Sequence, residues 1–463
     1  MLNRGTELPL RPYINFHRVN PALVCSWCSP VCPSMTGTAL EVACYMNIAI
    51  QKDRRVAGIR MQLTPTLRSR PLTISSTLRP KILLYSHDTF GLGNIRRTLL
   101  LAEELRNQYE GAAILIVTGS PMIQSFRIPA GVDYVKLPCL DRTDSERYEP
   151  RFLQQCADEV RRTRSAILRN TVLGFDPDLM IVDKRAGGVD GELLSALQAL
   201  KESGSKAKVV LGVRDILDGP ERTRASLKNN GSFEIIEEFY DEVWIYGSSC
   251  LFDAVKEYDF PDSVARITHF CGYLKRPTAQ PTREAGPPHV LVTTGGGGDG
   301  LALIRTYLEG LVELPRSTAL RTTVVFGPQM LPADRDALLK QFDYLADVSF
   351  LDFEPDLAAR YAAADVVVSL AGYNTVCELL SFAHRAILVP RAEPVQEQLI
   401  RARLLAAKGY FDLIEPEDLK PDILIARVLS ALKPTPTVVP PLDLDGLPRI
   451  VQRTAQLLEQ EYV

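Results

Sequence analysis

The feature that most constrains this chain is a regular alternation of short apolar strands and helix-forming segments, which starts at Lys81. In the first half the predicted strands span 81–85, 113–118, 133–137, 178–183, 208–213 and 243–246, with a long helix near 152–173. Strand and helix signals that alternate in this way predict a doubly wound parallel sheet of the Rossmann type.

A proline-rich break divides this pattern in two. Four prolines stand between Leu274 and His289 in a run without periodicity, which is typical of an interdomain linker. A second series of predicted strands follows at 289–294, 322–327, 348–351, 365–370, 386–390 and 411–414. We therefore predict an α/β protein with two Rossmann-like domains at 79–275 and 289–432, a linker at 276–288, and a tail with a terminal helix at 433–463.

Length and composition agree with two soluble domains. A chain of 463 residues is too long for one core, and 46% hydrophobic with 24% charged residues is ordinary for a globular protein. The net charge of −3 gives no reason to expect nucleic-acid binding. No apolar run approaches membrane-spanning length and the first residues lack a signal-peptide core, so we expect a cytoplasmic protein, with peripheral membrane contact left open.

The amino-terminal segment 1–78 differs from the rest. It contains no acidic residue from Arg54 onward and shows poor periodicity, which predicts a flexible extension. Four of the nine cysteines crowd there, at Cys25, Cys28, Cys32 and Cys44, but no histidine lies nearby at a usual ligand spacing, so we expect no metal. We expect the other five, Cys139, Cys156, Cys250, Cys271 and Cys377, to be buried thiols.

Two glycine-rich turns follow predicted first strands. The turn at 86–94 reads Ser-His-Asp-Thr-Phe-Gly-Leu-Gly-Asn and lacks the third glycine of a dinucleotide fingerprint, so a nicotinamide cofactor is not expected. We expect Gly91 and Gly93 to let a substrate approach, with His87 and Asp88 facing it. The run Gly295, Gly296, Gly297 and Gly298 opens the second domain, and we interpret it as a loop that holds an anion or nucleotide phosphate.

The segment 369–403 carries polar groups at two further strand ends. Gly372 lets a ligand approach the backbone closely. Asn374 and Thr375 lie where a helix begins, and the backbone amides at the start of that helix favour an anion. Glu378, one turn further, is placed to accept hydrogen bonds from sugar hydroxyls.

Charged residues also end two strands of the first domain. We expect Lys184, and with it Arg214, to contact an acceptor substrate. For Asp215 and Asp218 we favour pairing with arginines that fixes loops.

These motifs resemble the GT-B glycosyltransferases, and among them the MurG-like group that shares a family 28 carboxyl-terminal domain. The similarity covers about 81–432. It is most specific at 371–378, where Ala-Gly-Tyr-Asn-Thr-Val-Cys-Glu looks like the family's Ser-Gly-x-x-Thr-x-x-Glu donor motif. In addition, Glu397-Gln398, after Val389-Pro390, stands where the family has its acidic or glutamine pair. The first-domain motifs look like a bacterial subgroup of predicted glycosyltransferases without an established acceptor.

The resemblance implies roles for individual residues. Glu378 would bind the ribose of a nucleotide sugar. The diphosphate would be bound by Asn374, Thr375 and the backbone amides of Gly295–Gly298. Glu397 and Gln398 would bind the hydroxyls of the sugar. It implies no metal and no cofactor, the nucleotide sugar being a substrate. One departure is Asn94, which stands where the wider group has a histidine. Asparagine is no general base, so His87 or Asp88 would have to take the acceptor proton.

The residues and this resemblance together predict a metal-independent hexosyltransferase that moves a sugar from a nucleotide diphosphate donor, a UDP-sugar, to a hydroxyl acceptor. The resemblance implies that the transfer is inverting. Two alternatives stay open. A nucleotide-sugar epimerase would need several carboxylates in the cleft, and only Asp88 and Glu397 are nominated. A non-catalytic nucleotide-sugar-binding protein is compatible with Asn94.

Overall fold

The computed structural model of the chain describes residues 79–87, 92–142, 148–276, 286–315, 317–354, 357–382, 385–433 and 441–459. The predicted extension at 1–78, with its four cysteines, lies outside the described residues. So do Asp88, Gly91 and most of the predicted linker.

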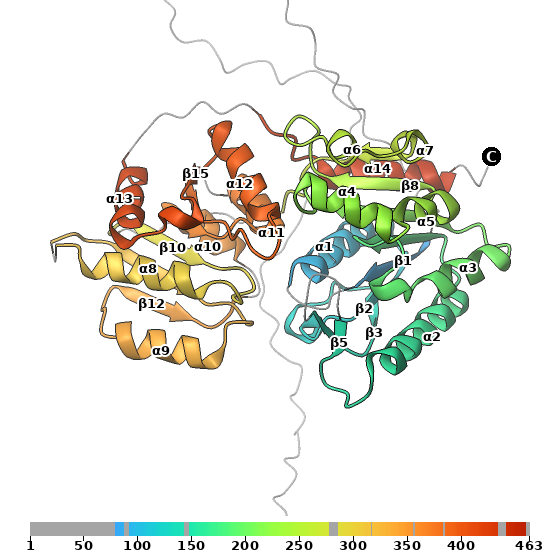
Figure 1. Cartoon of the computed structure of the whole chain (residues 1–463), viewed down its shortest axis with the longest axis horizontal. Coiled ribbons are helices and arrows are strands. Elements are labelled where there is room, and N and C mark those ends of the chain that lie inside the picture. The colour runs from blue at the N-terminus through green and yellow to red at the C-terminus, as the bar shows by residue number, and fades with distance from the viewer. Residues whose placement is uncertain are drawn as a thin grey trace, which may run out of the picture. The chain divides into compact units, whose positions relative to one another are not determined.

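The first domain is built on a parallel sheet of seven strands in the order β3-β2-β1-β6-β7-β8-β9 (Figure 1). These strands are β1 (Lys81–Ser86), β2 (Ala113–Thr118), β3 (Val132–Lys136), β6 (Leu179–Asp183), β7 (Lys208–Arg214), β8 (Glu242–Tyr246) and β9 (Thr268–Phe270). The central strands are buried on both faces, since β6 is buried at every position. Strands of this kind read as continuous apolar runs, which explains why the sequence pattern locates them well.

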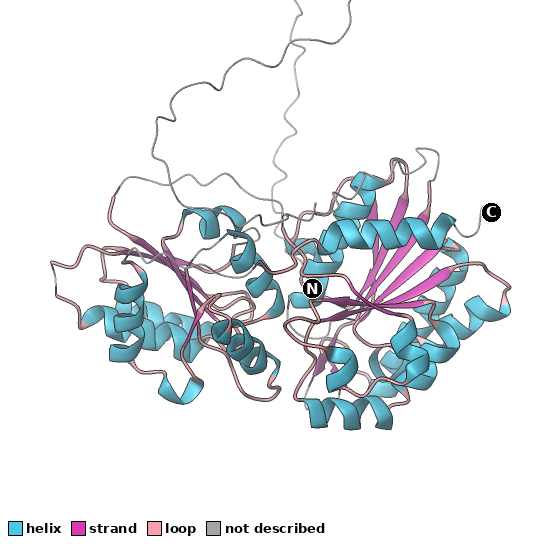
Figure 2. Ribbon diagram, turned by 90° about the horizontal axis from the view of Figure 1, so that it is seen from above, coloured by secondary structure: helices cyan, strands magenta, loops and turns pink. Residues whose placement is uncertain are grey.

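Helices cover both faces of this sheet (Figure 2). They are α1 (Gly93–Gln108), α2 (Ala157–Phe175), α3 (Leu194–Glu202), α4 (Pro220–Asn229), α5 (Ser232–Phe239), α6 (Ala254–Glu257) and α7 (Asp262–Arg266). Short 3-10 turns stand at Ile123–Ser125 and Val189–Gly191, and a small antiparallel hairpin is formed by β4 (Leu140–Arg142) and β5 (Tyr148–Pro150).

The second domain repeats the plan with a parallel sheet of six strands in the order β12-β11-β10-β13-β14-β15. The strands are β10 (His289–Thr293), β11 (Arg321–Val325), β12 (Val348–Leu351), β13 (Val366–Ser369), β14 (Ala386–Leu388) and β15 (Asp412–Leu413). Its helices are α8 (Leu301–Val312), α9 (Pro332–Phe342), α10 (Ala358–Ala363), α11 (Tyr373–Phe382), α12 (Glu397–Ala407) and α13 (Pro421–Ala431), with a 3-10 turn at Pro416–Asp418.

The last helix, α14 (Gly446–Glu459), returns to the first domain (Figure 1). Arg453 on this helix pairs with Glu242 at the start of β8, and Leu274 bridges to Asp445 just before the helix. Its buried side chains include Leu447 and Ile450, which join the core that also contains residues of α1. The carboxyl end of the chain therefore completes the amino-terminal domain.

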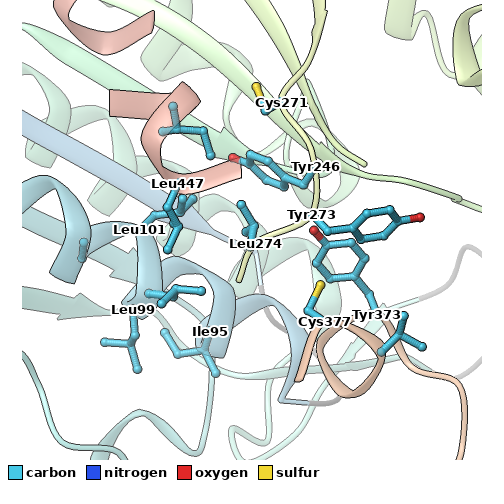
Figure 3. Close-up of a cluster of buried hydrophobic side chains, with 14 of the residues drawn as sticks. Ile95, Leu99, Leu101, Tyr246, Cys271, Tyr273, Leu274, Tyr373, Cys377 and Leu447 are labelled. Carbon is cyan, nitrogen blue, oxygen red and sulfur yellow. The ribbon is translucent and has the colours of Figure 1, made fainter. Parts of the chain in front are cut away.

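The core around α1 continues from one domain to the other. Tyr273, which follows β9, stacks on Tyr373 at the start of α11 with ring centroids 6.1 Å apart. Figure 3 shows these two rings side by side, with Cys377 next to Tyr373. The described residues belong to one compact unit, so these contacts join the two sheets directly.

The predicted fold class is confirmed: both sheets are parallel and wound with helices. One minor expectation is wrong, because Cys156 and Cys250 are exposed, whereas Cys139, Cys271 and Cys377 are buried as expected. Cys156 directly precedes α2 and Cys250 stands in the loop after β8, where no sheet covers them.

Candidate functional site

The site residues gather where each sheet reverses its direction of winding. In the first sheet this point lies between β1 and β6, and in the second between β10 and β13. Open α/β sheets bind ligands in the crevice outside the carboxyl ends of the strands at such a switch point. His87 follows β1, Asp183 ends β6, the glycine loop follows β10 and Gly372 follows β13.

His87 lies at the centre of a buried polar cluster in the first domain. Its side chain is 5% exposed, and its Nδ1 lies 4.0 Å from Oδ2 of Asp183. Arg97 donates to Oδ1 of Asp183 from Nε at 3.0 Å and from Nη2 at 2.5 Å. Asn94 bridges the cluster, because its Oδ1 accepts from Arg97 at 3.0 Å and its Nδ2 lies 3.2 Å from Nε2 of His87.

The electrostatic setting keeps the imidazole neutral. Burial lowers the pKa of His87 well below its usual range, and the nearby charges of Lys184, Arg185 and Arg97 lower it further. A neutral imidazole can accept a proton, but a lowered pKa makes it a weaker base than a free histidine. Asn94 contacts this ring through its side-chain amide.

In the second domain, the glycine loop and the turn after β13 meet at Thr375. A Cβ on Gly295 would lie 3.6 Å from Oγ1 of Thr375, and a Cβ on Gly372 would lie 3.9 Å from the same oxygen. No side chain caps the amino end of α8 beyond the loop. The predicted phosphate residues Gly295, Gly372 and Thr375 are therefore neighbours in space.

Two of the four loop glycines also have a packing reason, which sequence reasoning did not find. A Cβ on Gly297, whose φ is +96°, would lie 2.5 Å from the carbonyl oxygen of Phe326. A Cβ on Gly296 would lie 2.5 Å from Oε1 of Gln329. The loop thus lies directly against the chain that follows β11. Gly298, by contrast, is exposed.

Glu378 and Asn374 both contact the first domain. The Glu378 carboxylate is 1% exposed and pairs with Arg96 of α1 at 2.5 Å and with Arg276 at 2.9 Å. Asn374 donates from Nδ2 to the carbonyl oxygen of Gly93 at 2.8 Å. The predicted donor motif therefore lies against the start of α1, the helix that also carries Asn94 and Arg97.

Glu397 and Gln398 begin α12 and have different partners. Glu397 pairs with Arg214 of the first domain at 2.7 Å. Burial alone would raise the pKa of Glu397, but Arg214, Arg401, Arg391 and Lys184 together hold it below its ordinary value. The side chain of Gln398 accepts from the backbone N–H of Ala371 at 3.2 Å, so it supports the turn before Gly372.

Asp215 and Asp218 fix loops through arginines, as the sequence suggested. Asp215 accepts two hydrogen bonds from Arg401, at 2.9 and 2.7 Å, and Arg401 also donates to the carbonyl oxygen of Ala371. Asp218 pairs with Arg222 and accepts from the backbone N–H of Gln396 at 2.8 Å. Both aspartates therefore reach the second domain from the end of β7.

Lys184 directly follows β6, and Arg214 ends β7, the strand that pairs with β6. Both line one pocket whose other walls are apolar side chains under α4 and α5, including Leu217, Phe233 and Ile236. Sequence reasoning missed Arg96, Arg97 and Arg276, whose only signal was their position near a helix start or before the linker.

Among the described residues, no three His, Cys, Asp or Glu side chains gather as metal ligands. No helix in the described ranges is both long and apolar enough to cross a membrane.

Comparison with known proteins places the second domain in a family. Residues 289–440 match the model of the "Glycosyltransferase family 28 C-terminal domain". A relative from Phenylobacterium zucineum, "UDP-N-acetylglucosamine--N-acetylmuramyl-(pentapeptide) pyrophosphoryl-undecaprenol N-acetylglucosamine transferase", is 29% identical over 46% of this chain and 60% of its own length. Across such curated relatives, the chain spans about a fifth to three fifths of their length.

Solved structures show the same two-domain fold at low identity. A putative UDP-N-acetylglucosamine 2-epimerase from Listeria monocytogenes superposes with a TM-score of 0.53 at 13% identity, covering 83% of this chain and 98% of that one. The spinosyn forosaminyltransferase gives a TM-score of 0.51 at 14% identity, covering 83% and 96%. The chain has the GT-B fold, and its second domain belongs to the glycosyltransferase family 28 C-terminal domain family.

Proposed function

We propose that this protein is a glycosyltransferase that moves a sugar from a nucleotide diphosphate donor, a UDP-sugar, to a hydroxyl acceptor. The observation that carries the proposal is the meeting of Gly295, Gly372 and Thr375 at the switch point of a family 28 domain. The relative's name specifies UDP-N-acetylglucosamine as its donor, and this supports a UDP-sugar here.

In the proposed reaction, the loop amides after β10 and the amino ends of α8 and α11 hold the diphosphate. Their N–H groups stabilise the negative charge that develops as the diphosphate leaves, so the chemistry does not require a metal ion. Glu378, one turn into α11, accepts hydrogen bonds from the ribose, and Glu397 contacts the sugar. Arg96 and Arg276 pair with the buried Glu378 carboxylate and hold it in position.

The acceptor enters from the first domain. His87 takes the proton of the attacking hydroxyl at Nε2, while Arg97 and Asp183 fix the surroundings of the ring. Attack on the anomeric carbon opposite the departing diphosphate inverts the configuration through an oxocarbenium-like transition state. Asp88 is the other candidate for this proton transfer.

The Glu378→Ala variant tests the donor site. Loss of a charge-assisted hydrogen bond to the ribose should weaken UDP-sugar binding more than about tenfold, which corresponds to about 1.4 kcal/mol. Calorimetry with a panel headed by UDP-N-acetylglucosamine and UDP measures the affinity. Glu417→Ala, which changes an exposed carboxylate of the same domain, is the matched control. Unchanged affinity in Glu378→Ala, with a folded variant, would remove Glu378 from the site.

Product analysis separates the rival functions. Release of UDP together with transfer of the sugar to an added hydroxyl acceptor supports the proposal. Solvent-isotope exchange into the sugar without transfer would identify an epimerase instead. Tight binding of the UDP-sugar without any turnover would identify a binding protein.

A further inference from the structure

A lysine and a cysteine lie in contact at the carboxyl ends of β2 and β3, away from the candidate site. Lys136 is the last residue of β3, and its Nζ lies 3.1 Å from Sγ of Cys139. The same ammonium group donates to the carbonyl oxygen of Gly119 at 3.2 Å and to that of Leu137. Within the described part of the chain these are its three polar partners, so the ammonium group has a sulfur and no carboxylate beside it.

The turn that joins the two residues is fixed at each position. The N–H of Leu137 donates to the end of β2 at 2.8 Å, and the carbonyl oxygen of Cys139 accepts from the N–H of Arg151 at 3.1 Å. Between them, the carbonyl oxygen of Pro138 accepts from Nη1 of the fully buried Arg164 at 2.5 Å. The fold therefore holds the amine and the sulfur together, and reactions between groups held in this way are strongly accelerated.

The pair lies where solvent meets the domain. Lys136 is exposed, and Cys139 keeps 8% of its surface exposed. A cysteine sulfur beside a cation and within reach of solvent is the kind that peroxides oxidise most readily.

We propose that Lys136 and Cys139 form an oxidation-sensitive pair, in which a peroxide oxidises Sγ of Cys139 and the oxidised sulfur becomes covalently joined to Nζ of Lys136. The inference does not depend on the proposed sugar transfer, because neither residue belongs to the candidate site.

The first step is the oxidation of the sulfur by hydrogen peroxide. The sulfur attacks one peroxide oxygen and the O–O bond breaks, which gives a sulfenic acid and one molecule of water. The sulfur loses two electrons in this step, and the peroxide gains them.

The second step is the condensation of the sulfenic acid with the lysine amine. The ammonium group first loses a proton to water, and the amine then attacks the sulfur. The N–S bond forms, the S–O bond breaks, and the departing hydroxide takes a proton from the nitrogen to form water. Sulfenic acids condense with backbone nitrogen in the same way.

Trypsin can report the cross-link, since it cleaves after Lys136 only while that side chain is free. The whole protein is treated with hydrogen peroxide, its remaining thiols are alkylated, and the tryptic peptides are weighed by mass spectrometry. We expect an uncleaved peptide 128–142 that lacks two hydrogen atoms and carries no alkyl group on Cys139. Dithiothreitol added before alkylation should restore both the cleavage and the free thiol.

The Lys136→Arg variant is the matched control. It keeps a cation and a trypsin site at this position, but a guanidinium group does not attack the sulfur, so the cross-link should be lost. Cys156 and Cys250 are exposed and report the extent of oxidation in each sample. A thermal unfolding transition confirms that the variant is folded.

Two results would overturn the inference. One is cleavage after Lys136, with Cys139 unmodified or converted to sulfinic acid, under conditions that oxidise Cys156 and Cys250. The other is an equal yield of cross-link in protein unfolded by urea, because the fixed turn would then have no part in it. An uncleaved peptide that retains one added oxygen would identify an N–O–S bridge between the same two residues and would support the pairing.

Discussion

The burial of His87 predicts a pH dependence of stability. An unfolded histidine titrates near pH 6.5, whereas burial and the charges of Lys184 and Arg185 hold the pKa of His87 well below that value in the folded protein. Below about pH 6.5 the unfolded chain binds a proton that the folded chain does not bind, so the free energy of unfolding falls as pH falls. The His87→Gln variant should lose less stability than the unaltered protein between pH 7.5 and 5.5.

Urea unfolding at the two pH values measures this difference. At pH 7.5 the imidazole is neutral in both states, so the value there serves as the internal reference for each protein. Equal losses in the variant and the unaltered protein would show that His87 titrates normally in the folded state.

In transfer assays, the same variant should lose sugar transfer and keep donor binding if His87 is the base. Full activity would assign the proton transfer to Asp88 or another group.

Single residues were predicted from the sequence by their place at strand ends, but their partners were not. Glu378 is a candidate on motif alone, yet its partner Arg96 lies 282 positions away. Asp215 and Arg401 are separated by 186 positions. Such pairs form only when two domains dock, and no local pattern of apolar residues encodes that docking.

Gly297 and Gly372 are expected to be glycines for different reasons, the first for packing and the second for ligand binding. Gly297 has φ +96°, and a Cβ there would lie 2.5 Å from the carbonyl oxygen of Phe326. Gly372 has no positive φ, and among the described residues the nearest atom to a Cβ there is Oγ1 of Thr375, at 3.9 Å. Gly297→Ala should therefore destabilise the protein by about 1–3 kcal/mol through strain. Gly372→Ala should keep the stability and weaken UDP-sugar binding, because its methyl group stands where the ligand approaches.

Urea unfolding and calorimetry on both variants check this pair of outcomes. A Gly297→Ala protein as stable as the original would mean that the loop can move away from β11. A Gly372→Ala protein with undiminished affinity would mean that the ligand does not approach that turn.

Among the elements, two strands were predicted with the bounds that the structure shows. These are the largely buried β2 and the four-residue β12, none of whose residues is fully buried. The hairpin of β4 and β5 and the strand β9 were not predicted, because each strand has three residues and little alternation. Helix α14 was predicted within a few residues, but its packing on the first domain was not.

At the level of the whole molecule, the two sheets are tied together on several sides. Helix α14 returns from the second domain to the first, Tyr273 stacks on Tyr373, and the end of β7 reaches α12 through Asp215. The predicted donor turn and the His87 cluster share α1 as a common neighbour. The candidate site therefore depends on the docking of the domains as much as on either sheet.

The Asp215–Arg401 pair should account for much of that docking. Its side chains are 2% and 0% exposed, so removing one partner leaves a buried charge without its match. Asp215→Ala should destabilise the protein by about 3–5 kcal/mol, and Asp215→Ala combined with Arg401→Met should cost less than the sum of the single changes. In contrast, Glu415→Ala removes the partner of Arg403, which is 54% exposed, and should cost under about 1 kcal/mol. Urea unfolding measures the free energy of unfolding of Asp215→Ala, Arg401→Met, their combination and Glu415→Ala. Equal costs for Asp215→Ala and Glu415→Ala would show that the buried pair does not hold the domains together.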